Sequence, residues 1–212
     1  MKILNLYAGI GGNRKLWGDE HDITAVEYDE NIAKIYQDYF PNDKVIVGDA
    51  HQYLLDHYKE FDFIWSSPPC PTHTKMNVAN CLSPYKDNSK QLKTGGGIKP
   101  RYADMSLYQE IIFLQTHFRG QYCVENVIPY YKPLIPAQER DRHLFWANFY
   151  IREYRQKVAK ISMKTQEGLD LMGYDLSKYN NIDKEKIMRN CVLPKVGKHI
   201  LDCAINQSNL LL

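Results

Sequence analysis

The 212-residue sequence predicts one α/β domain, built on a mostly parallel sheet with helices on both faces. Short apolar segments alternate with helical patterns over residues 1–125, and this alternation is typical of parallel strands joined by crossover helices. The composition, 44% hydrophobic and 25% charged, is that of an ordinary globular protein. Ligands of such sheets bind beyond the carboxyl ends of the strands, so functional residues are expected there.

The elements follow from the apolar pattern. Five short apolar runs are predicted to be strands: Lys2–Tyr7, Ile23–Tyr28, Lys44–Val47, Phe61–Ser66 and Gln121–Glu125. Helical patterns lie between them at Glu30–Phe40, His51–Tyr58 and Leu107–Phe118, and a closing helix is predicted between Pro194 and Leu212.

The third helical pattern has the clearest signals. Ser106 stands three residues before Gln109, which predicts a capping box. One face of the helix is apolar, formed by Leu107, Ile111, Leu114 and Phe118.

Two stretches break the alternation. Residues 67–105 are rich in Pro, Ser, Asn, Lys and Gly, and a loop of this length inside a compact domain is usually functional or mobile. Residues 151–190 are polar and basic, with a weak strand pattern at Val158–Ser162 and short helices after it.

Charge is divided unevenly along the chain. Residues 1–70 carry 6 basic and 12 acidic side chains, whereas residues 71–212 carry 21 and 13. The basic second half indicates contact with a polyanion, the alternative being a solvated surface.

Several classes of protein are disfavoured by composition. No apolar run approaches the roughly 20 residues of a membrane span. The five cysteines include no CxxC pair and the seven histidines no ligand spacing, so we expect neither a disulfide framework nor a structural metal. We expect a reducing, cytoplasmic setting. His117 and His143 are interpreted as packing or surface residues.

Polar groups follow three of the predicted strands. The first ends in the glycine-rich turn Tyr7–Gly12, which lacks the GxGxxG pattern of nicotinamide binding. Glu27 at the end of the second could accept from ribose hydroxyls, Tyr28 could stack on a purine, and Asp49 could accept from an exocyclic amine. Together they indicate an adenosine ligand without a phosphate, with S-adenosylmethionine as the candidate.

The next two strands end in reactive side chains. Two prolines lead into Cys70 and stiffen its turn, so its thiol could act as a nucleophile; the alternative is an inert small side chain. Glu125 ends the fifth strand and should face the same crevice, where a carboxyl group could act as an acid. The alternative interpretation of Glu125 is an ordinary surface carboxylate.

These motifs resemble DNA cytosine-5 methyltransferases. Tyr-Ala-Gly-Ile-Gly-Gly, Pro-Pro-Cys, Glu-Asn-Val and the segment Gln138–Arg142 occur in that family's order, and Asn190–Pro194 is similar to its last motif. The compact chain looks like phage-encoded members. The resemblance implies a Rossmann-like S-adenosylmethionine-dependent methyltransferase fold. The catalytic domain would cover residues 1–150 and 188–212, and residues 151–187 would form a minimal target-recognition region.

The resemblance also implies roles for single residues. The methionine part of the cofactor would lie on Tyr7, Ala8, Gly9, Ile10, Gly11 and Gly12. Glu27 would bind its ribose, and the adenine would be surrounded by Tyr28, Asp49 and Ala50. The pocket would be completed by Pro68, Asn190 and Val192.

For catalysis, Cys70 would attack C6 of a cytosine flipped out of duplex DNA, and Glu125 would hold the N3/N4 edge. Arg142 would contact the base O2, with Arg140 steadying the site and a phosphate. The 71–104 segment is a candidate lid over the base, the alternative being a solvated linker. Phosphates would be contacted by Lys75, Lys90, Lys93, Lys99, Arg101, Arg155 and Lys157.

The chain departs from the family pattern in two places. Pro71-Thr72-His73-Thr74 stand where many members have Gln and an aromatic residue, so His73 could be no more than a surface residue. Only about 45 residues separate Arg142 from Arg189, where typical members hold a large recognition region. We therefore expect short or relaxed sequence specificity, or help from a homodimer or an accessory specificity subunit.

Two alternatives remain open from the sequence. The same chemistry could act on RNA, because a reduced recognition region also suits a folded RNA. The chain could instead be a non-catalytic module that keeps the cofactor pocket. The presence of Cys70, Glu125 and Arg142 argues against this alternative. A bacterial or phage-infected cell would be the setting, with restriction–modification, phage self-protection or regulation as the biological role.

Overall fold

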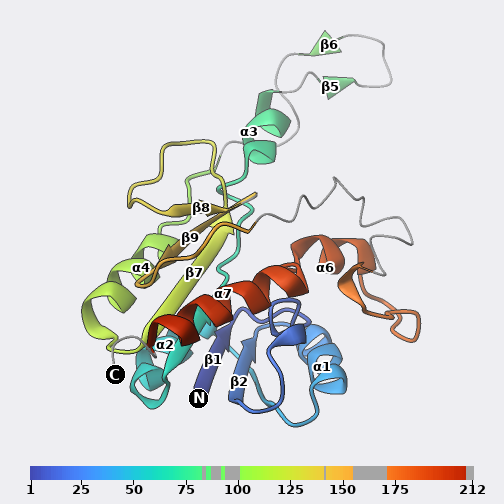
Figure 1. The fold of residues 1–212 in the computed structure, drawn as a ribbon. Helices are drawn as coiled ribbons and strands as arrows, with labels where there is room; N and C mark the ends of the chain where they lie inside the picture. The colour runs from blue at the N-terminus through green and yellow to red at the C-terminus, as the bar shows by residue number, and fades with distance from the viewer. Residues whose placement is uncertain (83–84, 87–91, 94–100, 141, 155–170, 209–212) are drawn as a thin grey trace.

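The computed structural model describes residues 1–82, 85–86, 92–93, 101–140, 142–154 and 171–208, and these form a Rossmann-like α/β fold (Figure 1). In the described residues the main sheet has seven strands in the order β3-β2-β1-β4-β7-β9-β8. Their bounds are β1 Lys2–Leu6, β2 Asp22–Glu27, β3 Lys44–Val47, β4 Phe63–Ser66, β7 Gln121–Val127, β8 Gln138–Arg140 and β9 His143–Ala147. All neighbours pair in parallel except β9, which is antiparallel to β7 and β8. The predicted fold class is confirmed.

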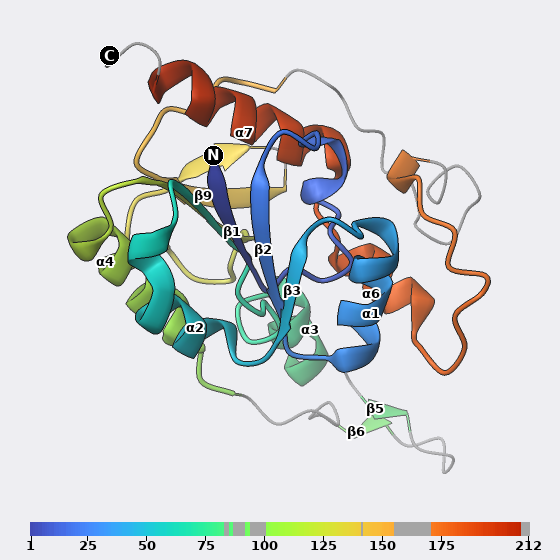
Figure 2. The same cartoon turned by 90° about the horizontal axis from the view of Figure 1, so that it is seen from below.

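Helices cover both faces of this sheet. α2 and α4 pack on one face, while α1 and α7 cover the other (Figures 1 and 2). The helices are α1 Glu30–Tyr39, α2 Ala50–His57, α3 Lys75–Leu82, α4 Ser106–His117, α6 Lys184–Asn190 and α7 Pro194–Ser208, with 3-10 turns η1 Arg14–Leu16 and η2 Tyr58–Glu60. None of the helices in the described part of the chain has both the length and the apolar character needed to cross a membrane.

Alternation of side chains along the strands creates two cores. Successive strand residues point to opposite faces, so Leu4 and Ile64 pack under α2 and α4 while Ile3 and Phe63 pack under α7. All four are fully buried. Because both faces are covered, the inner strands are apolar at nearly every position, as expected for parallel sheets.

Aspartates begin the first two helices. Asp29 accepts from the backbone N–H groups of Asn31 and Ile32 at 2.8 and 3.3 Å, and Asp49 caps α2 in the same way. The capping box predicted for α4 is wrong. Met105 is the N-cap residue, and Asp104 instead accepts from the Ser106 N–H at 3.0 Å. The apolar face predicted for α4 is confirmed, since Leu107, Ile111, Leu114 and Phe118 are all buried.

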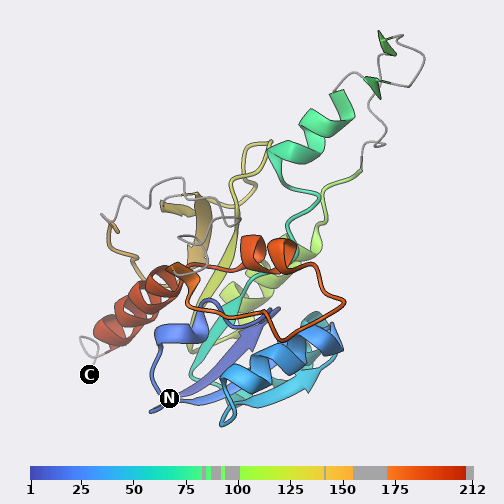
Figure 3. The same cartoon turned by 90° about the vertical axis from the view of Figure 1, so that its right-hand side faces the viewer.

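The stretch 67–105, expected to be a long loop, contains regular structure. It holds α3 and a short antiparallel pair, β5 Tyr85–Lys86 with β6 Leu92–Lys93. These elements project away from the sheet (Figures 1 and 3). β8 and β9 were not predicted, and the strand expected from Phe61 begins at Phe63. The strand pattern at Val158–Ser162 lies outside the described residues.

Residues 171–182, placed by the sequence in a reduced recognition region, pack against α1. Met172, Tyr174 and Leu176 are buried beside Ile35. Polar contacts add to this packing: Tyr39 donates to the Asp175 carbonyl at 2.7 Å, and the Tyr179 hydroxyl donates to Asp38 at 2.7 Å. This part of the segment is therefore built into the body of the domain, while its assignment to a domain stays a prediction.

The closing helix α7 lies across the turn that follows β1. Gly197, inside this helix, is where the two backbones meet: an ideal Cβ on Gly197 would stand 2.2 Å from the Asn13 carbonyl oxygen. Asn13 is itself fixed by a side-chain hydrogen bond to Asn5 at 2.8 Å. Only glycine therefore fits at position 197.

We predict that Gly197→Ala destabilises the protein by about 1–3 kcal/mol, because the added methyl group forces α7 away from Asn13. In an exposed helix the same change would stabilise by about 1 kcal/mol, so the sign of the effect is diagnostic. Chemical denaturation measures the free energy of unfolding, with exposed Lys195→Ala in the same helix as control. A Gly197→Ala protein as stable as the wild type would contradict this packing.

Candidate active site

The glycine-rich turn has a strained backbone and an open centre. Tyr7, Gly9 and Gly11 all have positive φ values, 53°, 55° and 83°. A Cβ on Gly11 would lie 2.4 Å from the Phe40 ring, whereas one on Gly9 would meet nothing within 4 Å. The turn is thus closed on the Phe40 side and open above Gly9, where a ligand could approach the backbone.

Glu27 joins this turn to the next loop. One carboxylate oxygen accepts from the Gly9 N–H at 2.9 Å, and the other accepts from the Asp29 N–H at 3.0 Å. Tyr28 beside it is 81% exposed. Because β1, β2 and β3 are neighbours, Glu27, Tyr28 and Asp49 lie near one edge of the sheet. Asp49 is exposed and also caps α2, and Ala50 is buried.

The segment between α6 and α7 packs on the glycine-rich turn. A Cβ on Gly12 would lie 2.5 Å from the Val192 carbonyl oxygen, so these two backbones are in contact. Burial raises the pKa of the Cys191 thiol to about 12, against the opposing effect of the Ile10 and Gly12 N–H groups. Val192 is buried, while Asn190 is exposed. The structure thus brings Cys191 and Val192 to the turn that the resemblance assigns to the cofactor.

Cys70 and Glu125 are carried by neighbouring strands: Cys70 follows the end of β4, and Glu125 lies near the end of β7. β4 and β7 pair in parallel with Ser66 opposite Val124, so both chains leave the sheet at the same edge. The buried Asn126 side chain donates to the Pro68 carbonyl at 3.0 Å and ties the two strand ends together. Glu125 is 8% exposed and its charge acts on the Cys70 thiol. The two side chains therefore lie at the same edge of the sheet, close enough for the Glu125 charge to act on the Cys70 thiol.

His73 is buried rather than a surface residue. Its side chain is 1% exposed and its Nδ1 lies 2.6 Å from the Tyr131 hydroxyl. Its backbone N–H donates to the Cys70 carbonyl at 2.9 Å, and its own carbonyl accepts from Tyr130 at 3.1 Å. His73 thus anchors the turn that carries Cys70 to the segment after β7.

The electrostatic environment opposes ionisation of Cys70. Burial raises the pKa of its thiol, and the nearby Glu125 carboxylate raises it further. A hydrogen bond to the backbone and the positive charge of Arg189 act in the other direction. The resting group is therefore held as a thiol, because a thiolate beside a carboxylate is unfavourable.

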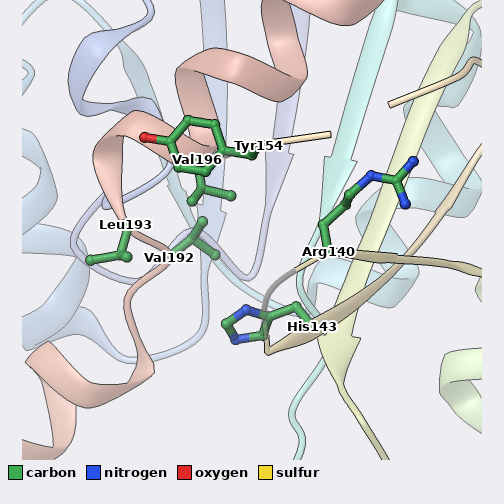
Figure 4. Close-up of a pocket in the computed structure, with 6 residues that line it drawn as sticks. All are labelled: Arg140, His143, Tyr154, Val192, Leu193 and Val196. Carbon is green, nitrogen blue, oxygen red and sulfur yellow. The ribbon is translucent and has the colours of Figure 1, made fainter. Parts of the chain in front are cut away.

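His143, interpreted from the sequence as a packing or surface residue, contacts the carboxylate of Glu125. Its Nε2 lies 3.5 Å from the Glu125 Oε1. This follows from the antiparallel pairing of β7 and β9, which sets Val127 opposite His143. Figure 4 shows the pocket that His143 enters, with lining residues Arg140, His143, Tyr154, Val192, Leu193 and Val196. The pocket thus lies between His143, which contacts Glu125, and Val192, which packs on the glycine-rich turn.

The two arginines of the Gln138–Arg142 segment differ in their surroundings. The Arg140 guanidinium donates to the carbonyls of Ile151 and Glu139, the latter at 2.7 Å, and lies over the Tyr150 ring. Arg140 therefore fixes the chain that follows β9. Arg142 is exposed.

Of the residues expected to contact DNA, Lys75 and Arg101 are exposed. Lys93 lies in β6, and Lys90, Lys99, Arg155 and Lys157 lie outside the described residues. Within the described part of the chain, no cluster of His, Cys, Asp or Glu side chains could hold a metal ion.

Sequence reasoning missed a buried acid, Glu110, on α4. Its carboxylate contacts the Tyr7 hydroxyl, Ser66 and His51. The signal was present but weak: Glu110 falls within the apolar stripe of α4, between Leu107 and Leu114, where a charged residue is unexpected.

Comparison with known proteins agrees with these motifs over part of the chain. Residues 1–76 match the C-5 cytosine-specific DNA methylase family. This match takes in the glycine-rich turn, Glu27, Asp49 and Cys70, and stops before Glu125. No curated protein matches the chain.

Three solved structures illustrate the structural similarity. A hypothetical protein of Thermus thermophilus has a TM-score of 0.43 at 13% identity, over 69% of this chain and 73% of that one. DNMT2 from Spodoptera frugiperda, solved as a mutant, has a TM-score of 0.36 at 25% identity, over 59% and 35%. A TehB-like SAM-dependent methyltransferase from Corynebacterium glutamicum has a TM-score of 0.35 at 18% identity, over 59% and 54%. The aligned region thus spans about a third of the DNMT2 chain.

We predict that Glu125→Gln makes Cys70 more reactive toward iodoacetamide at about pH 8. Removing the carboxylate charge lowers the pKa of the thiol, and one pKa unit changes the thiolate fraction about tenfold below the midpoint. A rate increase of about twofold to tenfold is expected. Arg189→Gln should slow the reaction, because it removes the cation that favours the thiolate.

Peptide mass spectrometry of the alkylated chain assigns the modification to Cys70. Glu60→Gln, at an exposed acid on η2, is the matched control and should leave the rate unchanged. Equal rates in wild type, Glu125→Gln and Arg189→Gln would contradict the electrostatic coupling described for Cys70.

Proposed function

We propose that the chain transfers a methyl group from S-adenosylmethionine to C5 of cytosine in DNA. The observation that carries this proposal is the placement of Cys70 and Glu125 at the ends of the paired strands β4 and β7, where the Glu125 charge acts on the Cys70 thiol. The match of residues 1–76 to C-5 cytosine-specific DNA methylases supports it.

The residues at the glycine-rich turn fit the cofactor. The space above Gly9 leaves room for a ligand against the backbone, and Glu27 supplies carboxylate oxygens that can accept from ribose hydroxyls. Exposed Tyr28 offers a face for a purine ring, with Asp49 as an acceptor for an exocyclic amine. Val192 packs on Gly12 and closes the other side. The cofactor, when bound, supplies an electrophilic methyl group on a sulfonium.

Cys70 starts the proposed reaction. Cytosine C5 is a poor nucleophile, and addition of the Cys70 thiolate to C6 places electron density on C5 while Glu125 holds the N3/N4 edge. A cofactor held by the glycine-rich turn and Glu27 would supply the methyl group to C5, and the electrons of the broken methyl–sulfur bond would stay on the cofactor sulfur. A water molecule accepts the C5 proton, and the bond between C6 and the Cys70 sulfur breaks to restore the aromatic ring and the thiolate.

Glu125 has a second effect in this scheme. Its charge opposes ionisation of Cys70 in the resting state. The proton that Cys70 loses can be shared between Glu125 and N3 of the base, which removes that charge. Binding of the base therefore favours formation of the Cys70 thiolate. When no base is present, Cys70 stays protonated and is protected from side reactions. The His143 Nε2 lies 3.5 Å from the Glu125 carboxylate, within reach of the same edge of the base.

Duplex DNA is the proposed substrate. The base must leave the stack to reach Cys70, which costs a few kcal/mol. α3 begins five residues after Cys70, and α3, β5 and β6 project away from the sheet (Figure 3). They are available to contact DNA, and Lys75 on α3 is exposed. Since residues 171–182 pack on α1, little of the 151–187 stretch is left for reading sequence. We propose a short or relaxed target, or a second subunit that supplies specificity.

We predict that duplex DNA containing 5-fluorocytosine, incubated with the chain and S-adenosylmethionine, gives a covalent adduct at Cys70. Fluorine at C5 cannot leave as a proton, so the adduct formed after methyl transfer cannot break down. Cys70→Ser should abolish the adduct. Denaturing electrophoresis detects it, and peptide mass spectrometry assigns it to Cys70.

Controls separate this proposal from its alternatives. Cys203→Ser, at a buried cysteine in α7, should leave trapping intact. Trapping on folded RNA but not on DNA would assign the same chemistry to RNA. Binding of S-adenosylhomocysteine with no methyl transfer to either nucleic acid would indicate a non-catalytic module. Equal methylation by wild type and Cys70→Ser would exclude the covalent mechanism.

A further inference from the structure

Glu110 lies at the centre of a buried cluster that the proposed reaction does not use. Its side chain, on α4, has no exposed surface. It accepts a hydrogen bond from the Tyr7 hydroxyl and one from the Ser66 hydroxyl at 2.7 Å, and His51 Nδ1 lies 3.0 Å from it. One carboxylate thus contacts the turn after β1, the end of β4 and the first turn of α2.

The partners of Glu110 compensate its burial. An ionised carboxylate is costly to bury unless its oxygens are hydrogen-bonded and its charge is paired. Both oxygens of Glu110 accept hydroxyl groups, and His51 supplies the opposite charge when protonated. Burial and the Glu110 charge raise the pKa of Tyr7, so its hydroxyl stays protonated and remains a donor.

Two of these partners begin the segments that form the proposed site. Tyr7 has a φ of 53°, a conformation that costs free energy in a non-glycine residue and persists only where the surroundings hold it. The glycine-rich turn starts there. Ser66 ends β4 and leads through Pro68 to Cys70. Glu110 therefore ties the proposed cofactor turn to the segment that carries the nucleophile.

We infer that Glu110 is a positioning residue that sets the glycine-rich turn for cofactor binding by holding the Tyr7 hydroxyl and the end of β4. This inference rests on the proposed function, because it assigns a role toward S-adenosylmethionine. It adds a residue that neither the motifs nor the family match contains, since Glu110 lies beyond residues 1–76.

The test is calorimetric titration of the purified full chain with S-adenosylhomocysteine. Glu110→Gln keeps the shape of the side chain but has one acceptor oxygen instead of two, so Kd should rise at least tenfold. Tyr7→Phe should raise Kd severalfold. Adding Tyr7→Phe to Glu110→Ala should weaken binding no further than Glu110→Ala alone, because Glu110→Ala already removes the acceptor of the Tyr7 hydroxyl. The matched control is Glu60→Gln, which changes an exposed acid 2.7 Å from His57 and should leave Kd within twofold.

Methyl transfer by the same variants separates positioning from a general loss of structure. KM for S-adenosylmethionine should rise with Kd in Glu110→Gln, while kcat at saturating cofactor stays within about twofold. Thermal unfolding shows whether each variant is folded. If Glu110→Gln does not fold, Tyr7→Phe and Ser66→Ala carry the test, because each removes one donor and leaves the acid in place.

Three outcomes would overturn the inference. The first is a folded Glu110→Gln, or a folded Tyr7→Phe and Ser66→Ala, with the Kd of wild type. The second is an additive effect of the Tyr7 and Glu110 changes. The third is a fall in kcat with KM unchanged. Absence of S-adenosylhomocysteine binding by the wild type would refute the proposed function and this inference with it, whereas wild-type binding with unaffected variants would refute the inference alone.

Discussion

The hydrogen bond from the Asn126 side chain to the Pro68 carbonyl, 3.0 Å long and buried, holds together the part of the molecule on which its chemistry depends. Parallel pairing of β4 with β7 brings two strand ends to one edge of the sheet, and this bond fixes the chain where each strand stops. Cys70 lies two residues after Pro68 and Glu125 one residue before Asn126, so the bond joins the segments that carry both side chains. The turn after Cys70 is then anchored to the same region through His73 and Tyr131.

Opposing electrostatic effects act on the Cys70 thiol. The Glu125 carboxylate and burial oppose the Cys70 thiolate, while Arg189 and a backbone hydrogen bond favour it. A site in which the nucleophile is held protonated by its own partner acid gains reactivity only when that acid is neutralised. In the proposed reaction, binding of the base neutralises Glu125. The reactive thiolate therefore forms only when a base is present.

The sequence was sufficient for the parallel part of the sheet, because apolar runs alternate with helical patterns and carry side chains to both faces. The sequence was insufficient where the pairing of strands determines the structure. β8 is three residues long and polar at the edge of the sheet, and β9 runs antiparallel, so neither fits the alternation. The contact of His143 with Glu125 could not be predicted for the same reason, since only the register of β9 against β7 brings the two together. His73, in a proline- and threonine-rich context, gave no sign of burial.

Residues close to the strand ends were predictable as candidates, because the carboxyl edge of a parallel sheet is where ligands bind. The network that supports them was not. Glu110 is distant in sequence from Tyr7, Ser66 and His51, and a single acid in an apolar stripe does not reveal its partners. The capping box predicted at the start of α4 does not form: Met105 is the N-cap residue, and Asp104 accepts from the Ser106 N–H instead.

The most direct test is a crystal structure of the chain with S-adenosylhomocysteine and a duplex that carries 5-fluorocytosine, after reaction with S-adenosylmethionine. The account predicts continuous density between the Cys70 sulfur and C6 of an extrahelical cytosine, the Glu125 carboxyl group at the N3/N4 edge, and the cofactor product against Gly9 and Glu27. A cytosine that remains in the helix, or one bound away from Cys70 with Glu125 unengaged, would contradict it.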